Sequence, residues 1–367
     1  MPLYDGTLLA SSYRQIVVVV NFRLGVFGFM SFWENGPTGG NYGLLDQQEA
    51  ISFIKQNAAK LQGDENRITI FGESSGASEV GYHLLNKKST SMISNAIMES
   101  GCYWWYAHSI SRSEEINTVV SNICREIDSC TVGDSIQETI KNLRAFDDMT
   151  VFWASKKVGT TFYPVFQDGI FFEEYAQDIH EQCKVQFDGS IITGANSFEG
   201  SLMYYGWEPT RFKPNEIRNV FRWLADIGDV PLWQQEFIIE KYFEIYRDYF
   251  PYAPHYRFLN TDDAYMIYSL IYGDFGFRRP SLLQSKQYQN CGSKVYSYYL
   301  DVETQWDLVT QKKLYFNGTG HGYEELHTWG ATELGTYPEL MNGLEPEQWE
   351  YDMTFIFQSQ WSRIGFA

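Results

Sequence analysis

The segment Gly72–Gly76 (GESSG) has the residue types and spacing of a nucleophilic serine. It follows the strand-like run Arg67–Phe71 and leads into the helix-like run Gly76–Leu85. A serine with glycines two residues away on either side forms the sharp turn called a nucleophile elbow. The turn aims the hydroxyl at a helix N-terminus, where free N–H groups favour negative charge. Ser74 is therefore the candidate nucleophile, and the Ser75 N–H is a candidate oxyanion donor. We expect both glycines to be needed, because crowding leaves no room for Cβ atoms.

Composition limits the class of protein. The chain has 367 residues, of which 44% are hydrophobic, and a formal net charge of −18. It can bury a sizeable core, and no repeat or linker divides it, so we expect a single domain over 1–367. The negative charge argues against nucleic acid, which requires clustered Lys and Arg. No stretch approaches the roughly 20 apolar residues of a membrane span.

Strand-like and helix-like runs alternate along the chain, which predicts a parallel sheet flanked by helices. Residues 109–178 look helical and irregular, and 209–285 look like an aromatic-rich, mostly helical cap over a site. The expected strands are Ile16–Val20, Arg67–Phe71, Asn95–Glu99, Gly189–Gly194 and Lys294–Leu300, and the clearest helices are Leu44–Ala58 and Gly76–Leu85.

Three blocks around the elbow resemble the type-B carboxylesterase and cholinesterase family of α/β-hydrolases. Asn21–Phe29 is similar to the family's N-Y-R-x-G-x-x-G-F segment, and Gly40–Gln47 to G-N-x-G-L-x-D-Q. Phe71–Ala77 resembles F-G-E-S-A-G-A, with Ser75 in place of the usual alanine. The resemblance implies an α/β-hydrolase fold, with a mostly parallel central sheet flanked by helices. It also implies ester hydrolysis through a serine-bound acyl-enzyme.

The start of the chain, Pro2–Gly6, resembles the segment just after the family's H-G-G-G oxyanion loop. Neither that loop nor the strands before it occur in this sequence. We therefore interpret the chain as an N-terminally truncated member whose first strands and oxyanion loop are missing. Losing one oxyanion donor typically costs about 10² to 10³ in rate. The activity of the chain as it stands is thus a separate question from the chemistry that it encodes.

A nucleophilic serine needs a base, and the base needs an orienting carboxylate. In α/β-hydrolases the acid and then the histidine follow the serine, each on a loop after a strand. Glu199 follows the strand that ends near Gly194, in a segment similar to the family's G-x-x-x-x-E-G, and is the candidate acid. His321 lies in a block that resembles H-G-x-E and is the candidate base. We expect its flanking glycines to let the imidazole swing between Glu199 and Ser74. His327 is the runner-up, but it lacks glycine neighbours.

Other residues take roles only from the resemblance. Glu73 would line the cleft near the scissile group, with a buried structural glutamate as the alternative. Ser100 resembles a serine that supports the acid from beneath. Cys124 and Cys130 sit where the family closes a small disulfide loop, with reduced buried thiols as the alternative. We expect no cofactor and no metal ion. The remaining cysteines are interpreted as free or buried: Cys102, Cys183 and Cys291.

The substrate is expected to be a small-molecule carboxylic ester. Cholinesterases narrow the acyl pocket with aromatic residues before an F-x-P-V segment, but Val158–Thr161, which precede that segment here, are not aromatic. Leu202 and Met203, just after the acid, are not aromatic either. Both departures favour a general carboxylesterase over a dedicated acetylcholinesterase. The family is mainly secreted or in the ER lumen, and the sequence does not predict an oligomeric state.

Two other functions compete with the esterase. One is a non-catalytic, neuroligin-like adhesion or binding protein on the same fold, and the other is an inactive truncated product. Binding relatives of this kind typically lose a triad member, whereas Ser74, Glu199 and His321 are all present. Their presence favours the enzyme.

Overall fold

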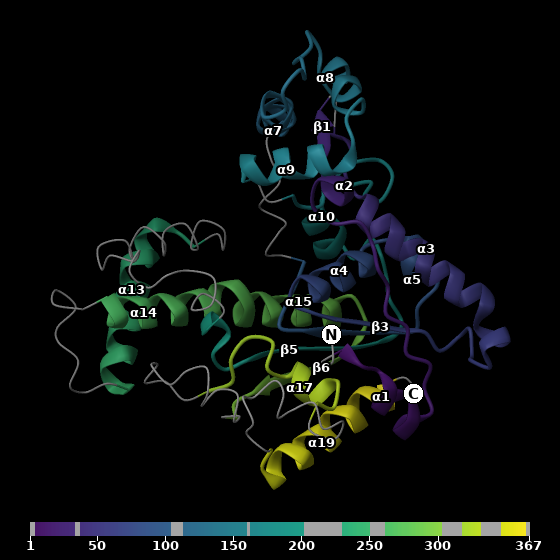
Figure 1. The fold of residues 1–367 in the computed structure, drawn as a ribbon. Coiled ribbons are helices and arrows are strands. Elements are labelled where there is room, and N and C mark those ends of the chain that lie inside the picture. The colour runs from purple at the N-terminus through teal and green to yellow at the C-terminus, as the bar shows by residue number, and fades with distance from the viewer. Residues whose placement is uncertain are drawn as a thin grey trace.

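The structure is a computed structural model in which the described residues are 4–33, 37–103, 113–159, 162–201, 230–249, 261–302, 318–331 and 346–364. Its centre is a sheet of four parallel strands in the order β3-β4-β5-β6 (Figure 1). Each strand of this sheet pairs with the strand that follows it in the sheet order and along the chain. Because the pairs are parallel, each connection must cross back to the other end of the sheet, and helices form these crossovers. The predicted parallel sheet flanked by helices is confirmed. The four strands are Thr69–Glu73, Asn95–Glu99, Ser190–Asn196 and Lys294–Leu300.

The parallel register brings the carboxyl ends of these strands to one edge. Glu73 of β3 lies opposite Glu99 of β4, and Glu99 lies opposite Gly194 of β5. In open parallel sheets, ligands bind just outside this edge. The loops that follow β3, β4 and β5 therefore begin next to one another.

Two layers of helices cover the sheet. On one face lie α3 (Tyr42–Asn57), α4 (Ser75–Leu84) and α15 (Arg279–Asn290). On the other face lie α1 (Thr7–Tyr13) and α19 (Gln348–Ile364), drawn below the sheet in Figure 1.

The side chains of β4 show how these layers form one core. Ala96 and Met98 pack in a cluster that includes Val80 of α4. The intervening Ile97 instead packs near Trp361 of α19. Successive side chains of a strand point to opposite faces, so β4 is buried on both sides, as expected for a central parallel strand.

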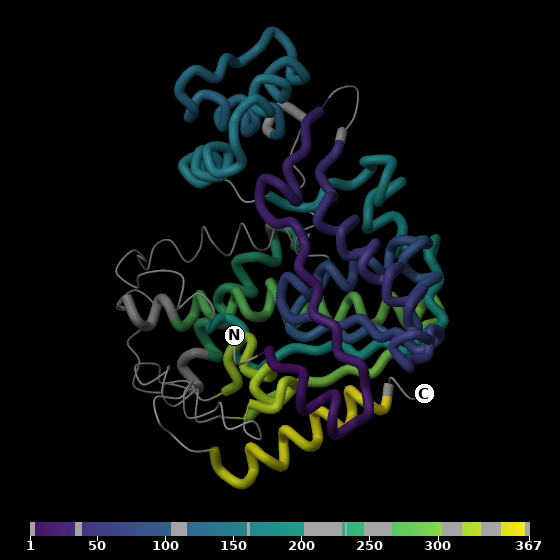
Figure 2. The backbone as a smooth tube through the Cα atoms, turned by 45° about the vertical axis from the view of Figure 1, so that its right-hand side comes forward, coloured from purple at the N-terminus to yellow at the C-terminus, as the bar shows by residue number. Residues whose placement is uncertain are grey.

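A lobe projects from the sheet, at the top of Figures 1 and 2. It has its own apolar cluster, which includes Val120, Ile123 and Leu143. Cys124 and Cys130 lie in this lobe and form a disulfide. Its elements are α2 (Gly25–Phe29), the hairpin of β1 (Ser31–Trp33) and β2 (Pro37–Gly39), α7 (Ser113–Arg125), α8 (Ile136–Leu143) and α9 (Asp148–Val158).

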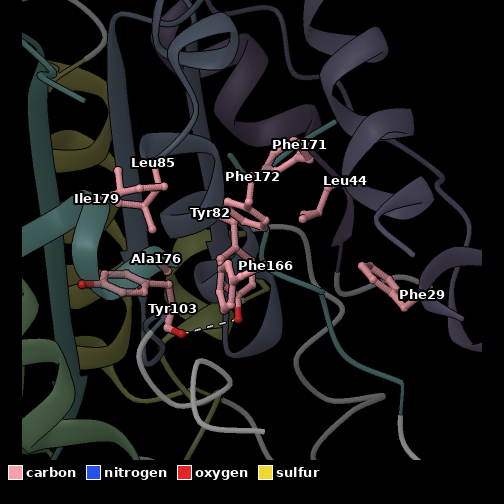
Figure 3. Packing of buried hydrophobic residues seen from close by; sticks show 10 residues of the cluster. All are labelled: Phe29, Leu44, Tyr82, Leu85, Tyr103, Phe166, Phe171, Phe172, Ala176 and Ile179. Atoms are coloured by element: carbon pink, nitrogen blue, oxygen red, sulfur yellow. Dashed lines mark hydrogen bonds between the residues drawn. The ribbon is translucent and has the colours of Figure 1, made fainter. Parts of the chain in front are cut away.

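An aromatic cluster joins α4 to the chain between the lobe and β5 (Figure 3). The ring of Tyr82 packs edge-on against Phe166 at 5.9 Å and Phe172 at 5.7 Å. Edge-to-face pairs at such distances add to the free energy of area burial. The cluster packs the C-terminal half of α4 against this part of the chain.

The predicted helical cap is described in part. Residues 209–229 and 250–260 lie outside the described residues, and the rest of the segment is helical. It contains α13 (Leu232–Tyr249), α14 (Thr261–Gly273) and the π-helix η7 (Asp274–Arg278), which runs directly into α15. The remaining short helices are η2 (Ala58–Leu61), α5 (Lys87–Thr90), α10 (Ala176–Glu181), η3 (Glu199–Ser201) and α17 (Glu325–Thr328).

The prediction of a strand over Ile16–Val20 was wrong. Within the described ranges no strand pairs with these residues, and Val18 and Val19 remain 43% and 66% exposed. Branching at Cβ favours extended backbone, but a strand also requires a hydrogen-bonded neighbour.

None of the described helices is long and apolar enough to cross a bilayer.

The interpretation of Cys183 and Cys291 as free or buried thiols was also wrong. They form a second disulfide, between the turn after α10 and the end of α15. The two residues are 108 positions apart, so sequence spacing gave no sign of the pair. Cys102 is buried and free, as expected.

The two disulfides predict unequal losses of stability. In the chain-entropy model, replacing Cys183 and Cys291 by serine lowers the unfolding free energy by about 5 kcal/mol, because the closed loop is long. The same change at Cys124 and Cys130, which are 6 residues apart, should cost about 2 kcal/mol. Urea unfolding of the two double variants measures the difference. Equal losses, or a larger loss at the short loop, would contradict this account.

Candidate active site

Ser74 occupies the turn between β3 and α4. Its φ of 56° and ψ of −118° place it in a region that non-glycine residues rarely adopt. The Ser74 N–H donates to the carbonyl of Glu99 at 2.9 Å, and its carbonyl accepts from the N–H of Ser78 at 3.1 Å. These bonds hold the strained turn against β4 and the first turn of α4. The Ser75 N–H belongs to that first turn, where backbone donors have no acceptor within the helix.

The glycines of the elbow play unequal roles. A Cβ on Gly72 would lie 2.5 Å from the backbone carbonyl carbon of Gly76. A Cβ on Gly76 itself would meet nothing within 4 Å. The expectation that both positions are crowded is thus correct for Gly72 and wrong for Gly76. Sequence reasoning missed Gly101, where a Cβ would lie 2.2 Å from the carbonyl oxygen of Ser74.

The structure brings Ser74, His321 and Glu199 together. His321 Nε2 lies 2.9 Å from Ser74 Oγ, and His321 Nδ1 lies 2.6 Å from Glu199 Oε2. A carboxylate accepts hydrogen bonds, so Nδ1 carries a proton and Nε2 is free to accept the serine proton. Glu199 is fully buried, and its other oxygen accepts the Asn196 N–H at 2.5 Å. These contacts have the order that the predicted roles of nucleophile, base and orienting acid require.

The loops that carry the acid and the base are joined by hydrogen bonds. The Phe198 N–H donates to the carbonyl of Thr319 at 2.9 Å, and the Thr319 N–H donates to Ser197 Oγ at 2.8 Å. The His321 N–H then donates to Ser201 Oγ at 3.0 Å. Because these bonds lie on both sides of Glu199, the carboxylate and the imidazole are placed by one shared unit.

The glycines beside His321 have a structural reason other than the expected freedom of the ring. A Cβ on Gly320 would lie 2.7 Å from the ring of Tyr323, and Gly322 has a φ of +76°. The imidazole itself is packed against the ring of Phe277, with the centroids 4.5 Å apart. The glycines therefore permit the tight turn, while the ring is held rather than free to swing.

The three other histidines that the structure describes do not join this group. His327, the runner-up, is fully buried with Nδ1 3.2 Å from Thr354 Oγ1, and burial lowers its pKa to about 4. His83 lies between Gln47 and Ser89, and burial lowers its pKa to about 4 as well. His180 contacts the Tyr103 hydroxyl. His108 and His255 lie outside the described residues.

Glu73 lies beside the base. Its Oε1 is 3.2 Å from His321 Nε2, close enough for an ion pair when the imidazole is protonated. Burial, followed by the charges of Glu324 and Glu325, raises the pKa of Glu73 well above its ordinary value. A buried carboxyl group with a raised pKa in a cleft is typical of a functional site.

Ser100 contacts Glu324 instead of the acid. The Ser100 hydroxyl and the Asn196 amide both donate to the carboxylate of Glu324, which is fully buried. Burial, followed by the charge of Glu199, raises the pKa of Glu324 to about 7. Glu324 is the last residue of the H-G-x-E block, so the sequence contained a signal for it, but sequence reasoning gave it no role.

The protonation of His321 reflects opposing effects. Burial lowers its pKa, but the hydrogen bond and the charge of Glu199 raise it, and Glu324 and Glu325 add to the rise. The net result is a pKa above the ordinary value of 6.5. The imidazolium is thus stabilised by the carboxylates around it.

The residues that predict a roomy acyl pocket fall largely outside the described structure. Thr160, Thr161, Leu202 and Met203 are not described, so the width of the acyl pocket stays a prediction.

Among the described residues, no group of three or more His, Cys, Asp or Glu side chains is arranged to hold a metal ion.

Comparison with known proteins identifies the family of the chain. A family model described as the carboxylesterase family matches residues 1–362. The chain belongs to the carboxylesterase family. It is 33% identical to the cocaine esterase of Homo sapiens over 56% of this chain and 34% of that protein. It is 27% identical to the cholinesterase of Mus musculus over 88% of this chain and 53% of that protein. For carboxylesterase 5A of Homo sapiens the identity is 28%, over 81% and 48% respectively.

These alignments cover between a third and about half of the relatives' own length. Membership of the carboxylesterase family, which the family model shows, establishes the α/β-hydrolase fold for this chain.

The two elbow glycines give a matched pair of variants for this carboxylesterase-family chain. Gly72→Ala should destabilise the fold by several kcal/mol, because the new methyl overlaps the Gly76 backbone. Gly76→Ala should be tolerated and stabilise by up to about 1 kcal/mol, because alanine favours helix over glycine. Thermal unfolding distinguishes the two. A Gly76→Ala variant as unstable as Gly72→Ala would contradict the geometry.

Proposed function

We propose that this chain carries the catalytic residues of a serine carboxylic-ester hydrolase. Ser74 is the nucleophile, His321 the general base and acid, and Glu199 the orienting carboxylate. The observation that carries the proposal is that His321 lies within hydrogen-bond reach of both partners, at 2.9 Å and 2.6 Å, through different ring nitrogens. Three residues from three separate loops rarely meet in this order without a catalytic role.

The reaction follows from the geometry. Ser74 Oγ attacks the ester carbonyl carbon while His321 Nε2 takes the hydroxyl proton. The tetrahedral intermediate collapses, and His321 returns the proton to the leaving alcohol. Water then attacks the acyl-enzyme with the same proton transfers, and the carboxylic acid product leaves Ser74. Glu199 holds the tautomer and stabilises the imidazolium, and the Ser75 N–H donates to the oxyanion.

Glu73 and Ser100 act around this centre. Because Glu73 Oε1 lies 3.2 Å from His321 Nε2, its carboxyl group lines the cleft beside the point of proton transfer. Ser100 bonds Glu324, three residues after the base, and so supports the turn that carries His321. We infer that both residues set the position and protonation of the imidazole rather than bond to substrate.

The substrate class is a general carboxylic ester. The names of two relatives, cocaine esterase and carboxylesterase 5A, support ester hydrolysis, and Val158–Thr161 contain no aromatic residue that would narrow the acyl pocket. A single domain over 1–367 and a secreted or ER-lumen location belong to the same proposal. The two disulfides support that location, because disulfides persist in oxidising compartments.

A fluorophosphonate probe tests the nucleophile. We expect mass spectrometry to map the adduct to Ser74, and we expect His321→Gln to reduce labelling by at least about 10³-fold, since an unassisted serine is a weak nucleophile. His327→Gln is the matched control, because it removes a buried histidine that does not touch Ser74. Absence of labelling both in the folded chain and in a folded version extended upstream with an H-G-G-G segment would reject the hydrolase and favour the non-catalytic binding role. Labelling of the extended version alone would favour the inactive truncated product.

The pH dependence of labelling tests the base. Neutral His321 accepts the proton, so the rate falls as the imidazole becomes protonated at low pH. Because the carboxylates raise the pKa of His321 above 6.5, the midpoint of this acid limb should lie above 6.5. Labelling rates measured between pH 5 and 9 locate the midpoint. A midpoint clearly below 6.5 would show that burial outweighs the carboxylates.

A further inference from the structure

The connection between α14 and α15 is a π-helix, η7, with a local cause in the sequence. The backbone N–H of Arg279 donates to the carbonyl of Asp274, five residues earlier. Pro280 follows at the start of α15. Proline has no N–H, and its ring clashes with the carbonyl four residues before it, here that of Gly276. The wider turn relieves that clash. Single π-turns inside helices are frequent at functional sites.

Interactions with two neighbouring elements hold this turn. The Tyr242 hydroxyl of α13 donates to Asp274 Oδ2 at 2.5 Å. Asp274 also forms an ion pair with Arg278, and Arg278 Nη1 donates to the Tyr299 hydroxyl of β6 at 3.1 Å. The π-turn is therefore fixed between α13 and the sheet.

The helices α14, η7 and α15 follow one another without a break, and this helical segment contacts both the loop that carries Glu199 and the side chain of His321. A Cβ on Gly200 would lie 1.7 Å from the Ser269 carbonyl of α14, so the acid loop packs directly on that helix. Eight residues later, Phe277 of η7 is 8% exposed and its ring lies 4.5 Å from the imidazole of His321 at an interplanar angle of 49°. One rigid element thus contacts the acid loop and the imidazole.

We propose that Phe277, aimed by the π-turn, is a positioning residue that holds the His321 ring between Glu199 and Ser74 and shields it from water. The proposal rests on the proposed function, because it assigns a role within the same reaction. The ring of Phe277 packs at a tilt against the imidazole and so opposes rotation away from its two hydrogen-bond partners. It also excludes water from the polar bonds that the imidazole makes.

Phe277→Leu tests the proposal because leucine keeps apolar bulk and removes the flat ring. We expect the limiting rate constant for labelling of Ser74 to fall about 10-fold, since small misplacements of catalytic groups are costly. The probe concentration that gives half of that rate should change less than two-fold. Water reaching the imidazole favours its charged form, so the acid limb should move to higher pH. The charged groups around the imidazole are unchanged in this variant: Glu73, Glu199, Glu324 and Glu325.

Phe172→Leu is the matched control. Phe172 is 1% exposed and lies in the aromatic cluster of Figure 3, which contains no triad member. The control should lose stability while keeping the labelling rate and the acid limb of the unsubstituted chain. If Phe277→Leu also keeps both, or if both variants shift equally, the proposal is overturned.

A second readout does not depend on turnover. Nitrogen-15 NMR of the histidine rings, with the His321 signals assigned by their loss in His321→Gln, gives the pKa of His321 directly. We expect that pKa to rise in Phe277→Leu and to stay constant in Phe172→Leu. If the unsubstituted chain and its version extended upstream with an H-G-G-G segment both fail to label, the hydrolase proposal fails, and the titration still decides the role of Phe277. An unchanged titration in Phe277→Leu rejects that role.

Discussion

The site depends on the buried side-chain and backbone amides of one residue, Asn196, at the end of β5. Its side-chain nitrogen donates to the Gly320 carbonyl at 2.8 Å and to the carboxylate of Glu324, and its backbone N–H donates to Glu199. A fully buried polar group is costly unless it is bonded, so these partners must stay together in the folded state. Because Gly320 precedes His321, the proposed base, and Glu199 is the proposed acid, the end of one strand sets the distance between them.

Much of this arrangement follows from local rules that a sequence displays. The elbow was predictable because a serine forced to a φ of 56° needs Gly72, whose missing Cβ lets α4 approach β3. Strands β4 and β6 were predicted with their observed bounds, β6 because it is rich in aromatic residues and β4 because it is a short run with an apolar centre. The acid and base positions followed from the rule that they come after strands. That the three residues meet is a tertiary fact, which the sequence could suggest only by resemblance.

Other features depend on contacts that no local pattern reveals. Ile16–Val20 has the composition of a strand but lacks a paired neighbour in the described chain, and pairing is a property of two segments. The partner of Cys183 is more than a hundred residues away, so only the fold could identify it. The π-turn at Asp274–Arg278 had a signal in Pro280, yet its consequence depends on where the His321 loop lies. The motif also predicted crowding at Gly76, but a Cβ at this position would meet nothing within 4 Å.

The disulfide between Cys183 and Cys291 also changes what a single cut in the backbone does. The covalent ring that it closes contains Glu199, α13, α14 and Phe277, whereas Ser74 and His321 lie outside it. A protease that cleaves once anywhere between the two cysteines leaves both fragments covalently joined. Glu199 would then remain covalently attached to the part of the chain that carries Ser74. The protein could thus be nicked and still migrate as one species until its disulfides are reduced.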